Sequence, residues 1–206
     1  MSSVKLTADA LSTAVAGTIE YDGRAFYGTP NGVLRGVIPG MQFFRLNADL
    51  AGANATGAQN VFGAGVTLQV STVYAYELVY ALTKSAGATS HTVAAGFGGT
   101  ATLNNIQRNL TVGGVTTAAT TAATLQTHGY LSVATSTVVT AALAAAACNV
   151  WVTERGTLSV SGGGTLVPQY TLSAAPGGAY STVAGSYMLI YPVGVAGANV
   201  VVGSWA

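Results

Sequence analysis

The fold of this chain is decided by one stretch of sequence, Tyr74-Ala75-Tyr76-Glu77-Leu78-Val79-Tyr80-Ala81-Leu82. Its large apolar and aromatic side chains fall on every second residue. That spacing places them together on one face of an extended strand. The preceding stretch Val66–Val70 alternates strictly as well. Both stretches therefore predict strands with one face turned towards a core.

Similar stretches continue to the end of the chain, separated by turns rich in Gly, Pro, Asn and Ser. They are Ser90–Phe97, Thr100–Ile106, Val133–Ala141, Val150–Val160, Leu166–Leu172, Tyr187–Val193 and Asn199–Trp205. Roughly seven to ten short strands at this spacing are typical of sandwiches and jelly rolls. We therefore predict an all-β chain in which residues 41–206 form a jelly-roll-like β-sandwich.

A smaller unit is expected before this domain. The sequence Thr18-Ile19-Glu20-Tyr21, Asp22-Gly23, Arg24-Ala25-Phe26-Tyr27 predicts a β-hairpin, because Asp-Gly suits a two-residue turn. Such a turn would bring Glu20 and Arg24 close together. The segment from Gly28 to Gly40, with two prolines, is expected to be a linker. Residues 1–40 are thus predicted to be an N-terminal anchoring hairpin segment and linker.

Charged residues are rare and unevenly placed. They make up 6% of the chain, against about 25% in ordinary domains. Eight of them lie before Leu50 and none lies after Arg155. A neutral surface loses little when it is desolvated, and a net charge of only +1 favours association. We therefore expect contacts with protein, including copies of this chain, and no binding of nucleic acid.

Other features bound the cellular context. The chain opens with no signal peptide, so synthesis in the host cytoplasm is expected. Its longest apolar run, Ala141–Cys148, has eight residues, far short of the roughly 20 that a membrane span needs, and no membrane insertion is expected. The single cysteine, Cys148, excludes an internal disulfide and is expected to be buried.

No motif for catalysis or cofactor binding emerges from the sequence. His91 and His128 are the only histidines, and neither has a second ligand at metal-binding spacing. His91 is expected at a partly exposed strand edge. A carboxylate pair for glycoside hydrolysis would have to come from Asp49, Glu77 and Glu154, and their spacing singles out no two of them. We predict that the chain is not an enzyme and has no catalytic, metal or cofactor-binding residues.

Aromatic residues are the remaining candidates for ligand contact. Most of them are expected to fill the core or a subunit interface. Tyr130 and Tyr180 lie beside glycine-rich turns and are expected to be exposed, where they would contact a sugar. A carbohydrate- or receptor-binding module that uses exposed Tyr and Trp is therefore the alternative function.

Two parts of the chain resemble proteins of tailed phages. The first runs from Lys5-Leu6-Thr7 through Ala16–Gly23 to Phe26-Tyr27 and Arg35, and is similar to a short module of fibre and virion proteins that is common in marine phages. The second resembles the terminal domain attached to that module. Its matching segments are Phe43–Asn47, Val61–Gly63, Tyr76-Glu77, Thr83-Lys84, Thr89–Thr92, Phe97–Thr102, Pro168–Tyr170 and Gly185–Tyr187.

The resemblance implies a β-rich, trimeric virion domain whose N-terminal part contacts the particle or a stalk. Fibre proteins carry a long shaft, and this chain has none. The expected function is therefore that of a homotrimeric phage structural protein on the virion surface, a capsid decoration or head-fibre protein or a short tail-fibre tip. Its partners would be capsid or tail proteins, and its alternative ligand a host surface glycan. The expected particle-anchoring residues are Ile19, Tyr21, Phe26 and Tyr27.

Overall fold

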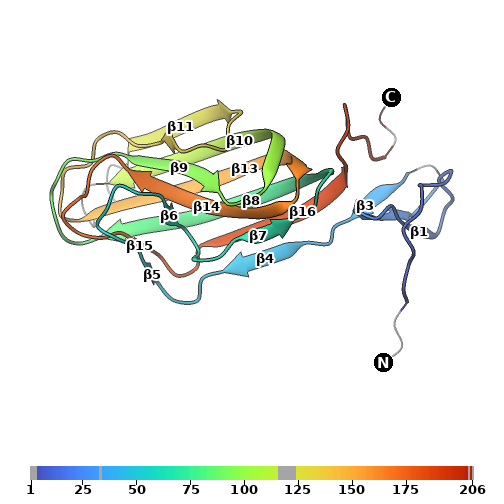
Figure 1. Cartoon of the computed structure of the whole chain (residues 1–206), viewed down its shortest axis with the longest axis horizontal. Coiled ribbons are helices and arrows are strands. Elements are labelled where there is room, and N and C mark those ends of the chain that lie inside the picture. The colour runs from blue at the N-terminus through green and yellow to red at the C-terminus, as the bar shows by residue number, and fades with distance from the viewer. Residues whose placement is uncertain (1–3, 33, 116–123, 204, 206) are drawn as a thin grey trace.

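A computed structural model of the chain describes residues 4–32, 34–115, 124–203 and 205, with the backbone alone for residues 115 and 124–130. Within these residues all sixteen elements are β-strands. No described segment is a helix of the length and hydropathy needed to cross a membrane. Two antiparallel sheets pack as a sandwich, and a small sheet lies at its N-terminal side (Figure 1). The predicted all-β sandwich with a small N-terminal β-segment is confirmed.

The larger sheet of the sandwich contains the long strands. Its order across the sheet is β11 (Thr124–Leu131), β10 (Thr102–Val115), β13 (Cys148–Gly162), β8 (Thr72–Lys84), then β16 (Tyr187–Val195) with β15 (Ser181–Thr182), and finally β4 (Gln42–Arg45) with β5 (Leu50–Ala51). Strands β15 and β16 occupy successive parts of the same side of β8. In the same way β5 pairs with β15 and β4 with β16.

The smaller sheet covers one face of the larger one. Its order is β12 (Thr137–Val138), β9 (Val93–Gly98), β14 (Gly164–Leu172), and then β6 (Gln59–Asn60) and β7 (Val66–Leu68), which both pair with β14. The two sheets enclose one continuous apolar core to which both contribute side chains.

The alternation of β8 produces this core directly. Its even-numbered residues from Tyr74 to Leu82 are all buried, while Glu77, Val79 and the other odd-numbered residues are half-buried on the outer face. Burial of each large apolar side chain stabilises the fold by about 1.5–3 kcal/mol. The strand predicted from this stretch is confirmed.

Two other predicted strands differ from the structure. Of the stretch 133–141 only Thr137–Val138 form a strand, because the carbonyl groups of Val133 and Thr135 turn inwards and accept hydrogen bonds from Arg108. The stretch 199–205 forms no strand in its described residues. The neighbouring strand β16 already pairs with β4 on one side and β8 on the other.

The N-terminal sheet consists of β1 (Thr18–Tyr21), β2 (Phe26–Thr29) and β3 (Gly36–Ile38). The predicted hairpin is present, but its turn spans four residues. Tyr21 pairs with Phe26, since the Asp22 carboxylate accepts hydrogen bonds from the backbone N–H groups of Arg24 and Ala25. The segment expected to be a linker supplies the third strand, β3.

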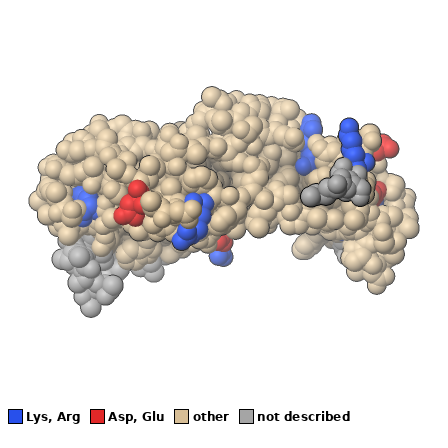
Figure 2. Space-filling view, turned by 90° about the horizontal axis from the view of Figure 1, so that it is seen from below, with Lys and Arg blue, Asp and Glu red and all other residues tan. Residues whose placement is uncertain are grey.

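The molecule is elongated, and its first and last described residues lie at the same end of it (Figure 1). The N-terminal sheet and the last residues occupy that end, which we call the terminal end, and β5 and β15 lie towards the opposite one. Figure 2 shows few charged side chains, scattered over a surface that is otherwise neutral.

Close packing around β13 gives a test of this core. A Cβ atom on Gly156 would lie 1.9 Å from the Gln107 carbonyl oxygen, whereas one on Gly114 would have no neighbour nearer than 3.8 Å. We expect Gly156→Ala to lower the free energy of unfolding by about 1–3 kcal/mol, because β10 and β13 must separate. Gly114→Ala is the matched control and should leave it unchanged or slightly raised. Urea denaturation measures both, and equal effects would contradict the packing described.

Candidate functional site

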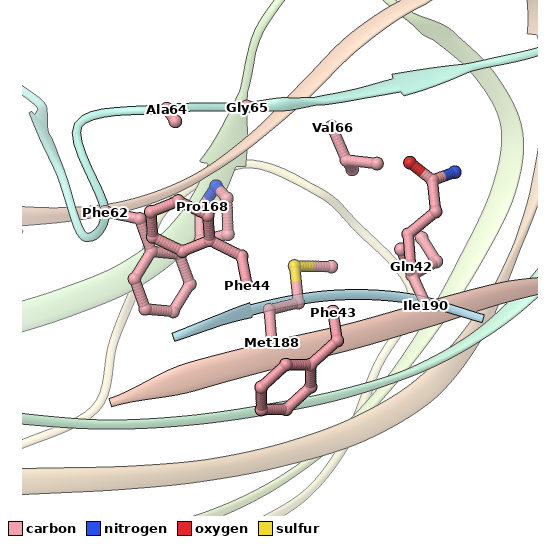
Figure 3. Close-up of a pocket in the computed structure, with 10 residues that line it drawn as sticks. All are labelled: Gln42, Phe43, Phe44, Phe62, Ala64, Gly65, Val66, Pro168, Met188 and Ile190. Carbon is pink, nitrogen blue, oxygen red and sulfur yellow. The ribbon is translucent and has the colours of Figure 1, made fainter. Parts of the chain in front are cut away.

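An apolar pocket opens at the edge of the sandwich, between β4 and β16 on one side and the chain before β7 on the other (Figure 3). Its volume is about 190 Å³, and none of the described residues that line it is charged. Phe44 lies against Phe62 with ring centroids 5.4 Å apart, and Met188 and Ile190 form the floor. The pocket can hold an apolar group but offers no titratable side chain for chemistry.

The pocket is bordered by a strand that is exposed on both faces. All four residues of β4 are exposed, and Phe43 lies on the outer side, 5.7 Å from the Tyr187 ring. Sequence reasoning did not single out this edge. The adjacent phenylalanines were the available signal, because neighbouring strand residues face opposite sides and cannot both enter one core.

The four predicted anchoring residues differ in how accessible they are. Ile19 is 61% exposed and Phe26 42% exposed, and Tyr21 is half-buried with its ring stacked on Phe26 at 4.6 Å. Tyr27 is buried, and its hydroxyl donates a hydrogen bond to Asp22. Burial is the main cause that raises the pKa of Tyr27 well above its usual range. Only the first three can contact a partner in this conformation.

An ion pair fixes the N-terminal sheet, although not the one expected. Glu20 binds Arg35 at 2.6 Å, while the Arg24 guanidinium donates to the carbonyl of Gly23. Glu20 does not reach Arg24 because the turn has four residues. It pairs Glu20 with Tyr27, whereas a two-residue turn would have paired Glu20 with Ala25. Hydrogen bonds from Ser12, followed by the charge of Arg35, lower the pKa of Glu20.

The prediction that Tyr180 is exposed is wrong. Tyr180 is completely buried, and its hydroxyl lies 2.9 Å from Nε2 of His91. The glycines near Tyr180 mark a close contact of two turns over it: a Cβ atom on Gly87 would lie 2.3 Å from the backbone of Gly177. Burial raises the pKa of Tyr180 far above its usual range. Tyr130 lies in β11, and its side chain is outside the described residues.

The expected exposure of His91 is also wrong, because His91 lies beneath the same turns. Its Nδ1 atom is 2.7 Å from the Thr89 carbonyl oxygen. Beside it, the three N–H groups of the buried Lys84 ammonium are shared among four carbonyl oxygens within 3.2 Å, those of Ala86, Gly87, Ala145 and Ala146. Cys148 is buried in the same region, as predicted. These groups are held by backbone and by each other, and we assign them to the structure of this end of the sandwich.

The most strongly buried charges form a network between the sheets. Arg108 and Glu154 make two hydrogen bonds, from Nε to Oε1 at 2.8 Å and from Nη2 to Oε2 at 2.9 Å. The Tyr76 hydroxyl donates to Glu154 at 2.7 Å. Arg108 also donates to the Ala95 carbonyl in the opposite sheet, and its guanidinium lies 5.2 Å from the Phe97 ring.

The three carboxylates considered for glycoside hydrolysis do not come together. Glu154 is on the inner face of the larger sheet, while Glu77 on the outer face binds Tyr187 at 2.6 Å and Arg155 at 2.7 Å. The Tyr187 hydrogen bond is the first cause of a lowered pKa for Glu77. Asp49 accepts a hydrogen bond from the backbone of Ala184. Among the described residues no group of three or more metal-ligating side chains is present.

The buried pair gives the second test. Glu154→Gln should lower the free energy of unfolding by roughly 3–5 kcal/mol, because the Arg108 charge is left inside without a counter-charge. The double variant Arg108→Met/Glu154→Leu should lose much less. Tyr80→Phe is the control, since its buried hydroxyl has no hydrogen-bond partner among the described residues and its removal should cost little. Urea denaturation measures the free energy of unfolding of each variant. Equal decreases in the single and double variants would contradict the prediction that an unpaired Arg108 charge is the cause of the loss.

These sites comprise an apolar pocket, an exposed apolar hairpin face and two buried polar clusters. Comparison of the chain with protein-family models, with curated proteins and with solved structures finds no match. The function is therefore inferred from the geometry of the molecule.

Proposed function

We propose that this chain is a non-enzymatic structural protein of a bacteriophage particle, displayed on the virion surface and attached through its terminal end. The observation that carries the proposal is the distribution of exposed apolar side chains. Of seventeen large ones among the described residues, seven lie before residue 40 and four after residue 194, whereas three lie in β4 or directly before it and three elsewhere in the sandwich. Exposed apolar side chains gathered in one region mark a surface that binds another protein.

The anchoring surface is the outward face of the hairpin. Ile19 and Phe26 are its exposed members, with Tyr21 stacked beneath Phe26. The ion pair between Glu20 and Arg35 and the buried Tyr27 stabilise the sheet that presents them. Such a surface would bury apolar area against a capsid or tail protein at little desolvation cost.

The order of strands supports a jelly roll, the fold of many viral capsid domains. In chain order the main strands are β4, β7, β8, β9, β12, β13, β14 and β16. Across one sheet they lie in the order β4, β16, β8, β13, which are the first, eighth, third and sixth in the chain. Across the other they lie in the order β7, β14, β9, β12, which are the second, seventh, fourth and fifth. This is the order of two successive Greek keys. The hairpin β10–β11, which comes between β9 and β12, extends the first sheet beyond β13.

A homotrimer is the proposed assembly. The neutral surface and the exposed β4 edge with Phe43 and Phe44 favour contacts between copies, because few ions must leave water when they form. The absence of enzymatic activity is proposed because Asp49, Glu77 and Glu154 are each engaged by a different partner. Synthesis in the host cytoplasm and incorporation during assembly complete the proposal, with decoration of the head preferred to a tail-fibre tip.

Light scattering tests the assembly. The purified protein should have three times its chain mass of 20.5 kDa. A monomer over a range of concentrations would contradict the trimer and leave attachment to the particle as a separate question.

Attachment is tested with the double variant Ile19→Ser/Phe26→Ser. Cosedimentation with virions assembled without this protein should fall at least tenfold, because the anchoring face loses its apolar area. The matched control is Val138→Ser, which removes an equally exposed side chain from the side of the sandwich and should bind as the wild type does. Undiminished binding by the double variant would refute the anchor.

A further inference from the structure

A crevice of about 800 Å³ lies on the outer face of the larger sheet, where the sandwich meets the terminal end. Its floor is formed by β10 and β13, and its walls by Gly36 and Val37 of the N-terminal sheet and by the last described residues. The volume lies in the range of ligand-binding clefts, which is roughly 300–1,000 Å³. The proposed anchoring residues Ile19 and Phe26 do not line this crevice.

Four polar side chains in the crevice have no hydrogen-bond partner among the described residues. Asn105, Gln107 and Thr157 stand on the exposed face of the sheet, and Asn199 lies on the wall. None of them makes a side-chain hydrogen bond with a described residue. Asn104, next to this group, differs in that its amide donates to Ser159. The four together offer three amides and one hydroxyl, each able to donate and to accept.

An aromatic ring adds to this polar row. Trp205 lines the crevice and is 82% exposed, an unusual degree for a tryptophan. Its indole N–H donates to the Val202 carbonyl at 3.0 Å, which orients the ring. Both a flat apolar surface and hydrogen-bonding groups are therefore available to one ligand.

The lining restricts the chemistry of that ligand. None of the described residues that line the crevice is Asp, Glu, Lys, Arg or His, so an ionised ligand would find no counter-charge among them. On the floor β10 and β13 pair with each other, and β13 also pairs with β8 on its other side. The floor therefore offers a ligand the side chains of both strands and not the backbone of β13. The ligand must be neutral, rich in hydroxyl or amide groups, and flat enough on one face to lie on an indole.

We propose that the crevice binds a neutral oligosaccharide, with a sugar ring on Trp205 and its hydroxyl groups hydrogen-bonded to Asn105, Gln107, Thr157 and Asn199. Sugar rings have such an apolar face of C–H groups, edged by hydroxyls, and the negative face of an aromatic ring attracts C–H groups. The inference goes beyond attachment to a particle and uses neither Ile19 nor Phe26.

The test uses the full-length protein and defined saccharides. Maltohexaose, cellohexaose, mannotetraose and chitotetraose are screened by saturation-transfer NMR, with sialyllactose and a heparin hexasaccharide as charged probes. At least one neutral saccharide should bind, and neither charged probe should. The Trp205→Ala variant and the double variant Asn105→Ala/Gln107→Ala should each weaken that binding about tenfold or more, since the first loses the aromatic surface and the second two hydrogen-bonding amides.

The matched control is Asn109→Ala, which removes an exposed amide from the same face of β10 outside the crevice. It should bind the saccharide as the wild type does. Binding of no neutral saccharide, or binding that survives both crevice variants, would overturn the proposal. Cosedimentation with virions separates the two functions: the crevice variants should still attach, and Ile19→Ser/Phe26→Ser should still bind the saccharide.

Discussion

The strictest constraint on the architecture is one ion pair buried between its two sheets. Arg108 of β10 and Glu154 of β13 neutralise each other inside the core, and the remaining donors of Arg108 reach carbonyl groups on β9 and on the chain before β12. A dry pair of charges is tolerated only when nearly every donor and acceptor is satisfied. The pair therefore fixes the spacing of the sheets and the path of the segment 133–135.

At the other end of the sandwich a second buried charge is likewise surrounded by hydrogen-bond acceptors. The ammonium group of Lys84 binds four backbone carbonyls that belong to two different turns. A chain with only thirteen charged residues, seven basic and six acidic, thus places three of them in its interior. Charges that would ordinarily keep a surface solvated serve here to connect loops and layers, and the surface is left neutral.

Periodicity in the sequence was enough to predict the longest strands of the sandwich. The alternation from Tyr74 to Leu82 predicted the central strand, and the hairpin around Asp22-Gly23 was found in the right place. Arg108 was missed as a core residue, although it lies in phase with Ile106, Leu110 and Val112, all of which are buried. A charged residue in an apolar phase is a usable signal of a buried pair.

Other features depend on contacts between distant segments. The hairpin turn was misjudged because the Asp22 side chain binds two backbone groups and thereby adds two residues to the loop. Tyr180 was misjudged because Gly87 and Gly177, ninety residues apart in sequence, allow two turns to touch over it. The crevice beside Trp205 joins five segments of the chain, and no local pattern could have assembled it.

The pairing of β4 with β16 has a mechanical consequence. Gln42 is aligned with Ile190, so the first and last main strands of the sandwich enter and leave it side by side. A force that pulls Gln42 and Ile190 apart would separate β4 from β16 by breaking their hydrogen bonds one after another. If both points are tethered to one support and the load acts on the opposite end of the molecule, the strands are loaded along their length and many hydrogen bonds must break together. The same fold is therefore weak in one direction of pull and strong in the other.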